Sequence, residues 1–113
     1  MITGSREEFE ELVADAIDSL PPEFAERLDN VAIVVEDEPP GPLLGLYEGV
    51  PQPARGAHYN LALPDVITIY RRPLEARAHS REGLARDVRK TVLHEIAHHF
   101  GISDERLDEL GWS

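Results

Sequence analysis

The sequence contains no cysteine, one methionine, one lysine and few aromatic residues, which make up 6% of its 113 positions. The absence of cysteine excludes a disulfide framework and any metal site built from thiolates. A metal must therefore be held by histidine, aspartate or glutamate. The chain also lacks a run of the roughly 18 apolar residues needed to cross a bilayer, and Met1 precedes a polar, acidic segment. We therefore expect a soluble, cytoplasmic protein.

Basic residues are also scarce, with 11 against 22 acidic ones, so that the formal net charge is −11. The electrostatic field of such a negatively charged protein repels phosphate backbones and anionic membrane surfaces. We therefore expect neither nucleic acid nor a membrane as a partner. The length fits a single domain over residues 1–113, and 42% hydrophobic residues are enough for one modest core.

The first half of the chain predicts one helix and two strands. The helix begins with a capping box formed by Ser5 and Glu8, and Pro21 and Pro22 end it. A continuous β-branched run is typical of a buried strand, and a weaker strand follows it. The expected ranges are 5–20 for the helix, Phe24–Leu28 for a short helical turn, Val31–Val35 for the buried strand and Leu43–Tyr47 for the weaker one.

The second half predicts a strong strand and the longest helix. The strand covers Val66–Tyr70 and ends at Arg71, Arg72 and Pro73, after the long loop Glu48–Asp65. Ser80 caps a helix that runs from Arg81 to about Phe100. Its apolar residues lie four apart along one stripe, which consists of Leu84, Val88, Val92, Ile96 and Phe100.

The chain after this long helix predicts a sharp turn and a last short helix. Gly101 is well placed to end the long helix, and Ser103 or Asp104 can cap the next one. Trp112 is expected to close the core. The predicted fold class is α+β, with a small three- to four-stranded mixed sheet packed on the long helix and helices at both ends of the chain.

The residues from His94 to His98 match the pattern H-E-x-x-H, and they lie well inside the predicted long helix. Two histidines four apart share one helix face, so that both imidazoles can reach a single ion. Glu95, about 100° round the helix, lies beside the metal and can take a proton from water. Lone histidines are more often structural, but the pair and the glutamate together favour a metal site. His99 points about 100° away from His98 and is expected either to pack or to support the metal ligands from behind.

A hydrolytic zinc site needs a third protein ligand and an open fourth position. Because Gly101 lets the chain fold back, the carboxylate of Asp104 can return to the ion. The competing interpretation of Asp104 is a helix N-cap, a role that Ser103 can fill instead. Glu105 is the alternative ligand, and His58 and His79 are remoter ones. Zinc is favoured over Fe²⁺ or Mn²⁺ because it usually occupies redox-silent, nitrogen-rich sites.

The stretch H-E-I-A-H-H-F-G-I-S-D, residues 94–104, resembles the H-E-x-x-H-x-x-G-x-x-D pattern of the minimal zincins, small bacterial zinc-dependent metallopeptidases. The resemblance extends over most of the chain from about Leu43 onward. It implies that His94, His98 and Asp104 bind Zn²⁺ and that Glu95 is the general base. It also implies an α/β fold in which a small sheet packs on the metal helix, and a peptide or protein as the substrate.

The chain differs from larger zincins in two respects. Asp104 replaces the third histidine of metzincins, and Met1 is the only methionine, so that no methionine turn lies under the site. A domain this small offers a shallow groove. Candidate oxyanion donors are Tyr47, Tyr59, Tyr70 and His58. Val66–Arg71 is the candidate strand for pairing with a peptide, and Arg71 and Arg72 are candidates for favouring acidic substrates.

Two other functions fit parts of the pattern. Small bacterial endoribonucleases also use a helical H-x-x-x-H and a third ligand after a glycine, but they have glycine at the position of Glu95. The net charge of −11 further disfavours RNA. The other alternative is a zinc-binding regulatory or protein-binding module without turnover. A fourth coordination position closed by His58 or Glu105 is expected in that case.

Overall fold

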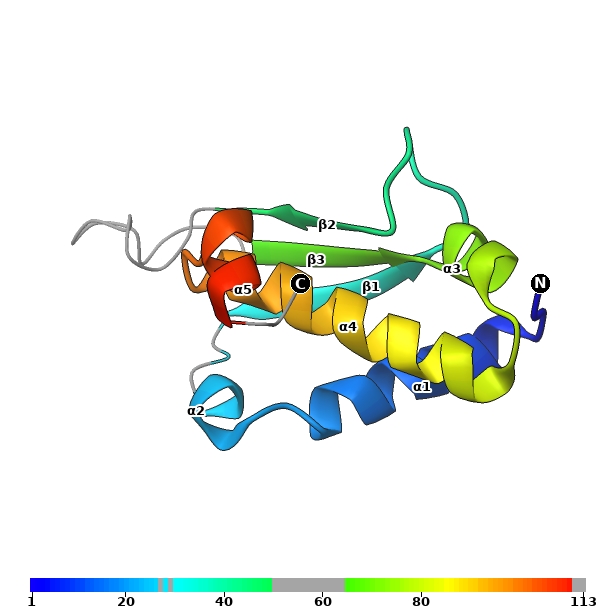
Figure 1. Cartoon of the computed structure of the whole chain (residues 1–113), viewed down its shortest axis with the longest axis horizontal. Coiled ribbons are helices and arrows are strands. Elements are labelled where there is room, and N and C mark those ends of the chain that lie inside the picture. The colour runs from blue at the N-terminus through cyan, green and yellow to red at the C-terminus, as the bar shows by residue number, and fades with distance from the viewer. Residues whose placement is uncertain (27, 29, 50–64, 111–113) are drawn as a thin grey trace.

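A computed structural model describes residues 1–26, 28, 30–49 and 65–110. The described chain contains eight elements, which confirm the predicted α+β class (Figure 1). In order these are α1 (Arg6–Asp18), α2 (Pro22–Ala25), β1 (Val31–Glu36), β2 (Gly45–Glu48), β3 (Asp65–Tyr70), α3 (Arg71–Arg77), α4 (Arg81–His99) and α5 (Asp104–Leu110). Trp112, His58 and Tyr59 lie outside the described residues.

Helix α1 begins with the predicted capping box. The Ser5 hydroxyl accepts a hydrogen bond from the Glu8 amide at 3.1 Å, and the Glu8 carboxylate accepts one from the Ser5 amide at 3.0 Å. The helix ends at Asp18, two residues earlier than the prolines suggest. Pro22 instead begins α2. Proline fits the first turn of a helix, because amide groups there form no hydrogen bond within the helix and the missing N–H costs none. The predicted turn at Phe24–Leu28 therefore starts earlier than expected.

The sheet has the order β1-β3-β2, with β1 parallel and β2 antiparallel to β3. The central strand β3 is the most buried one, and Ile67 and Ile69 are fully covered. The prediction that Val31–Val35 is a buried strand is wrong. It forms the edge strand β1, in which Val35 is buried and Val34 is 38% exposed. An apolar, β-branched run predicts a strand, but it does not say which strands flank it.

Helix α3 follows β3 directly and was not predicted. The strand ends where expected, yet Arg71 is already the first residue of the helix. Pro73 falls in the first helical turn, where no backbone hydrogen bond is lost. Leu74 is fully buried, so this helix covers one end of the core. The Arg71 guanidinium donates to Asp37 at 2.9 Å, and Arg72 pairs with Glu38 at 3.3 Å.

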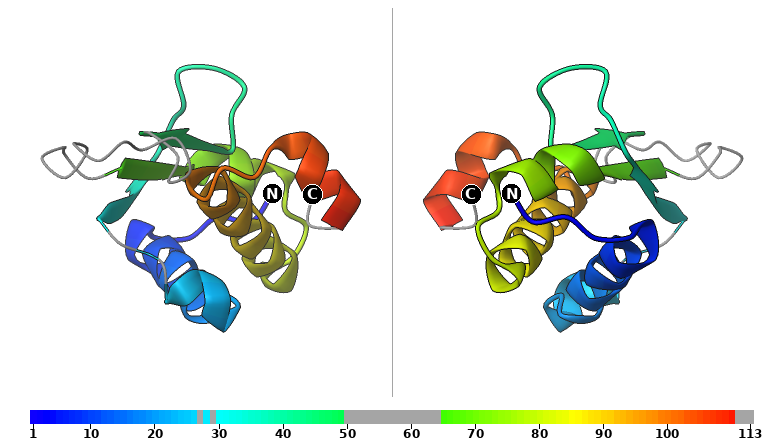
Figure 2. Two further views of the ribbon diagram at one scale, coloured as in Figure 1. Left: turned by 90° about the vertical axis from the view of Figure 1, so that its left-hand side faces the viewer. Right: turned by 90° about the vertical axis from the view of Figure 1, so that its right-hand side faces the viewer.

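Helices α1 and α4 lie side by side against one face of the sheet (Figure 2). Ser80 caps α4 by accepting a hydrogen bond from the Gly83 amide at 2.9 Å, as predicted. The predicted apolar stripe of α4 faces the sheet and α1. The core they share includes Phe9, Val13, Ala16, Ile67, Ile69, Leu74, Leu84, Val88, Val92 and Ile96. None of the helices in the described ranges combines the length and apolarity that crossing a membrane requires.

Candidate metal centre

Two histidines one helical turn apart face the same side of α4 near its C-terminal end. The ring centroids of His94 and His98 are 4.7 Å apart. Their side chains are 33% and 31% exposed, so that both are held by the helix yet open to solvent. The position inside a regular helix fixes their spacing, because residues four apart lie one above the other.

The chain after α4 turns back sharply at Gly101, which has a φ of 79°. The Gly101 amide donates to the His98 carbonyl, and the Ile102 amide to the Ala97 carbonyl, both at 2.9 Å. This is a Schellman arrangement, in which glycine supplies the left-handed residue. The reversal brings the start of α5 beside the histidines of α4.

Asp104 lies at this reversal, and its carboxylate contacts both imidazoles. Its Oδ1 is 2.9 Å from His98 Nε2 and 3.0 Å from His94 Nε2. The N-terminal cap of α5 is Ser103, whose hydroxyl accepts a hydrogen bond from the Arg106 amide at 3.1 Å. Because Ser103 caps the helix, the Asp104 side chain points to the histidines instead. Ser103, and not Asp104, is therefore the N-cap residue of α5.

The three side chains fit a small divalent ion. One ligand atom from each of His94, His98 and Asp104 lies within 4.8 Å of the others. Tetrahedral zinc with bonds of about 2.0 Å places its ligand atoms about 3.3 Å apart, close to the two histidine–aspartate distances. In the described part of the chain no second group of three such ligands is found, and Glu105 is not part of this one. His79 precedes α4, whose first residue, Arg81, is about 20 Å along the helix axis from His94.

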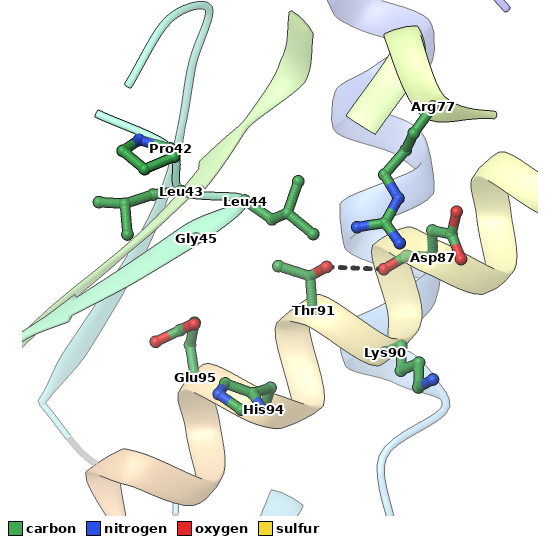
Figure 3. Close-up of a pocket in the computed structure, with 10 residues that line it drawn as sticks. All are labelled: Pro42, Leu43, Leu44, Gly45, Arg77, Asp87, Lys90, Thr91, His94 and Glu95. Atoms are coloured by element: carbon green, nitrogen blue, oxygen red, sulfur yellow. Dashed lines mark hydrogen bonds between the residues drawn. The ribbon is translucent and has the colours of Figure 1, made fainter. Parts of the chain in front are cut away.

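Glu95 lies beside His94 but on the side of α4 that faces β2 (Figure 3). Its side chain is buried, with 8% of the residue exposed. Loss of hydration raises the pKa of the Glu95 carboxyl, while the nearby His94 and His98 partly offset this rise. A buried carboxyl with a raised pKa next to a metal-type cluster has the properties of a general base.

A groove of about 370 Å³ begins at His94 and Glu95 and continues between α4 and the chain around β2. Its other lining residues are Pro42, Leu43, Leu44, Gly45, Arg77, Asp87, Lys90 and Thr91 (Figure 3). The two elements lie close together at Gly45. A β-carbon added there would lie 3.0 Å from Thr91 Cγ2 and 3.1 Å from Glu95 Cγ. Glycine at this position therefore lets β2 lie directly against the helix.

The strand that borders the groove is β2, not the predicted Val66–Arg71 segment. That segment corresponds to β3, whose two edges are occupied by β1 and β2, so it cannot accept a peptide strand. Among the described residues β2 pairs with β3 alone. The Tyr70 amide donates to the Leu44 carbonyl at 3.0 Å. Since hydrogen-bonded pairs alternate in an antiparallel ladder, the backbone groups of Gly45 face the other, outer edge.

His99 is fully buried and belongs to a polar network that the sequence did not reveal. Its Nδ1 is 2.8 Å from Asp65 Oδ2, and the Tyr47 hydroxyl donates to the same oxygen at 2.7 Å. The packing role predicted for His99 is confirmed. Tyr47 was a candidate oxyanion donor, but its hydroxyl is directed to Asp65. The overlooked signal was a charged residue at the start of the most buried strand.

Three comparisons with known proteins bear on this site. The model of the zincin-like metallopeptidase family matches residues 28–112. The chain therefore belongs to the zincin-like metallopeptidases, a family that implies a bound metal ion, usually zinc. Among solved structures, a conserved hypothetical protein from T. thermophilus is 28% identical, with 95% of this chain and 97% of that chain covered and a TM-score of 0.55. No curated protein matches the chain.

Proposed function

We propose that the chain is a zinc-dependent peptidase in which His94, His98 and Asp104 hold the metal and Glu95 is the general base. The observation that carries this proposal is the position of Glu95. Its buried carboxyl lines the same groove as His94. Glu95 also lies in the helical turn between His94 and His98, which form the cluster with Asp104. A purely structural metal site does not need a buried carboxylate directed into an adjacent groove.

A zinc ion held by His94, His98 and Asp104 would supply Lewis acidity, which would polarise a carbonyl oxygen and lower the pKa of water. Glu95 then accepts the proton of the attacking water and passes it to the leaving amine. Its raised pKa suits the first step, because the carboxyl is a stronger base than that of an ordinary glutamate. Neutral His94 and His98 offer lone pairs to the metal, and Asp104 contributes a negative charge.

The peptide would bind as an additional strand on the outer edge of β2. The outward-facing backbone groups of this strand, among them those of Gly45, can form main-chain hydrogen bonds with an extended peptide. Main-chain recognition does not depend on sequence, and it would hold the scissile carbonyl over the helix that carries the catalytic residues. Of the four candidate oxyanion donors, Tyr47 donates to Asp65, Tyr70 is buried in β3, and His58 and Tyr59 lie outside the described residues.

The exposure of the two histidines favours an enzyme over a binding module. A third of each side chain is accessible to solvent, which leaves room for a fourth ligand that is water or substrate. Glu105, which would close the site in a structural role, is not part of the cluster. The exclusion of nucleic acid and membrane partners and the cytoplasmic location remain predictions from the sequence.

The decisive experiment combines metal analysis with hydrolysis of a peptide library. Protein purified without added metal or chelator should contain about one zinc per chain, and the His94→Ala/His98→Ala double variant should contain none. Glu95→Gln should keep the zinc and lose hydrolysis by at least roughly a hundredfold. A Glu95→Gln variant that hydrolyses peptides as fast as the wild type would exclude this mechanism. A wild type that takes up no zinc would exclude the metal site itself.

A further inference from the structure

The far end of the groove carries two cations that pair with no carboxylate in the described part of the chain. Most arginines there do form such ion pairs, namely Arg6, Arg71, Arg72, Arg81 and Arg106. Arg77 and Lys90 both line the groove, both are exposed, and neither forms an ion pair with any described residue. Asp87 offsets one of the two charges, so this end of the groove keeps an excess of positive charge. This local excess contrasts with the net charge of −11 of the whole chain and suits the binding of an anionic group.

For a peptide that pairs antiparallel with β2, the direction follows from two contacts between β2 and α4. Gly45 lies against Thr91 and Glu95, whereas the Tyr47 ring is 5.9 Å from the His99 ring. Strand and helix therefore run in the same direction. A peptide that pairs antiparallel with β2 runs the opposite way, from the His99 end toward Lys90. The part of the peptide after the scissile bond then lies in the groove that ends at the two cations.

The spacing along the groove matches a short stretch of extended peptide. Lys90 is one helical turn before His94, a rise of about 6 Å. An extended chain covers about 3.3 Å per residue. With the scissile bond level with His94, Lys90 is therefore level with the second residue after that bond. Leu44 and the Thr91 methyl group supply an apolar wall between Glu95 and the cations, and Leu43 also lines the groove (Figure 3).

We propose that Arg77 and Lys90 bind a carboxylate on the C-terminal side of the scissile bond, about two residues beyond it. The substrates are therefore peptides that present either a free C-terminus or an acidic side chain at this position, after an apolar residue. This proposal rests on the peptidase function proposed above. It differs from the sequence-based suggestion that Arg71 and Arg72 favour acidic substrates, because those two side chains already pair with Asp37 and Glu38.

The test uses the zinc-loaded full-length chain and three peptide mixtures analysed by mass spectrometry. One mixture has free C-termini, the second has amidated C-termini, and the third is amidated but contains internal aspartate and glutamate. We expect cleavage about two residues before a free C-terminus or an acidic side chain, and a roughly threefold to tenfold slower reaction in the plain amidated mixture, since these charge pairs are partly exposed to solvent. Comparing the first and third mixtures shows which carboxylate is used.

The matched variants separate this role from a general effect of charge. Arg77→Ala/Lys90→Ala should remove the difference in cleavage rate between acid and amide peptides. Arg89→Ala should keep this difference, because Arg89 is an exposed cation on the same helix outside the groove. Added salt should reduce the difference in the wild type, because exposed charges are screened. Equal cleavage of all three mixtures, or an unchanged preference in the double variant, would overturn the proposal.

A binding measurement tests the carboxylate site without any need for turnover. Acetyl-leucyl-alanine is titrated as the free acid and as the amide into zinc-loaded wild type and the Arg77→Ala/Lys90→Ala variant by calorimetry. The acid should bind about threefold to tenfold more tightly to the wild type only. Tighter binding of the acid without cleavage of any peptide would refute the peptidase function but keep the carboxylate site. Cleavage of peptides with equal binding of acid and amide would refute the carboxylate site but keep the peptidase function.

Discussion

His99 Nδ1 lies 2.8 Å from Asp65 Oδ2, and both side chains are almost completely shielded from solvent. The contact joins the last turn of α4 to the first residue of β3, positions that are far apart in the sequence. The Tyr47 hydroxyl on β2 donates to the same aspartate oxygen. One buried carboxylate thus holds together the helix that carries the candidate metal site and the strand that borders the groove.

Asp65→Asn is expected to destabilise the metal-free protein by roughly 2–4 kcal/mol, because it disturbs a buried, hydrogen-bonded polar group whose partners stay buried. Tyr47→Phe removes one hydrogen bond and should have a smaller effect, about 1 kcal/mol. Urea unfolding in the presence of a chelator measures both changes. Glu36→Gln, at an exposed position of β1, is the control and should stay within about 0.5 kcal/mol of the wild type. An equally small effect of Asp65→Asn would show that the network contributes little to stability.

Asp104→Ala should weaken zinc binding at least tenfold, since it removes one of three candidate ligands and the only negative charge among them. Glu105→Ala is the matched control, because the adjacent carboxylate is not part of the cluster and should leave the affinity unchanged. Competition with a fluorescent zinc chelator measures both affinities. If Glu105→Ala were the more damaging change, the third ligand would be assigned to the wrong residue.

Gly45→Ala should destabilise the protein by roughly 1–3 kcal/mol, because the new β-carbon would lie 3.0–3.1 Å from Thr91 and Glu95 and would push β2 away from α4. Gly41→Ala is a clean control, since a β-carbon there meets nothing within 4 Å. Adding Thr91→Ser to Gly45→Ala removes one of the two clashes and should recover part of the loss. Thermal unfolding measures all three variants. Equal stability of the Gly45 and Gly41 variants would refute the close approach of β2 and α4.

Glu95→Gln should stabilise the metal-free protein at pH 7. Burial raises the pKa of the Glu95 carboxyl in the folded state, so at pH values above that pKa the ionised group opposes folding. The advantage of glutamine is therefore complete at pH values above the folded pKa and shrinks as the pH falls below it. It disappears below the unfolded value, at about pH 4.

Thermal unfolding in chelator between pH 4 and pH 8 measures this difference. Glu48→Gln, an exposed carboxyl on β2, is the control for the loss of one negative charge from an acidic protein. A Glu95→Gln variant that is less stable than the wild type at pH 7, or a difference that does not change with pH, would contradict the desolvated state of Glu95.

Much of the fold could be predicted because its signals are local. The capping box of Ser5 and Glu8 and the four-residue spacing of the α4 stripe depend only on the helical period and on hydrogen bonds between near neighbours. Helix α3 was missed because Pro73, taken as the end of a strand, also fits the first turn of a helix. Which strand lies at the centre of the sheet could not be predicted, since β1 and β3 have similarly apolar sequences.

The sequence by itself determined which side chains gather at the candidate metal site. The helical period places His94 above His98, and Gly101 and Ser103 turn the chain so that Asp104 returns to them. All these interactions span about ten residues. Only the tertiary structure decided that β2 borders the groove, that Glu95 is buried beneath it, and that Asp65 binds His99. Such contacts depend on strand order and on packing between distant segments, which the periodicity of one segment does not encode.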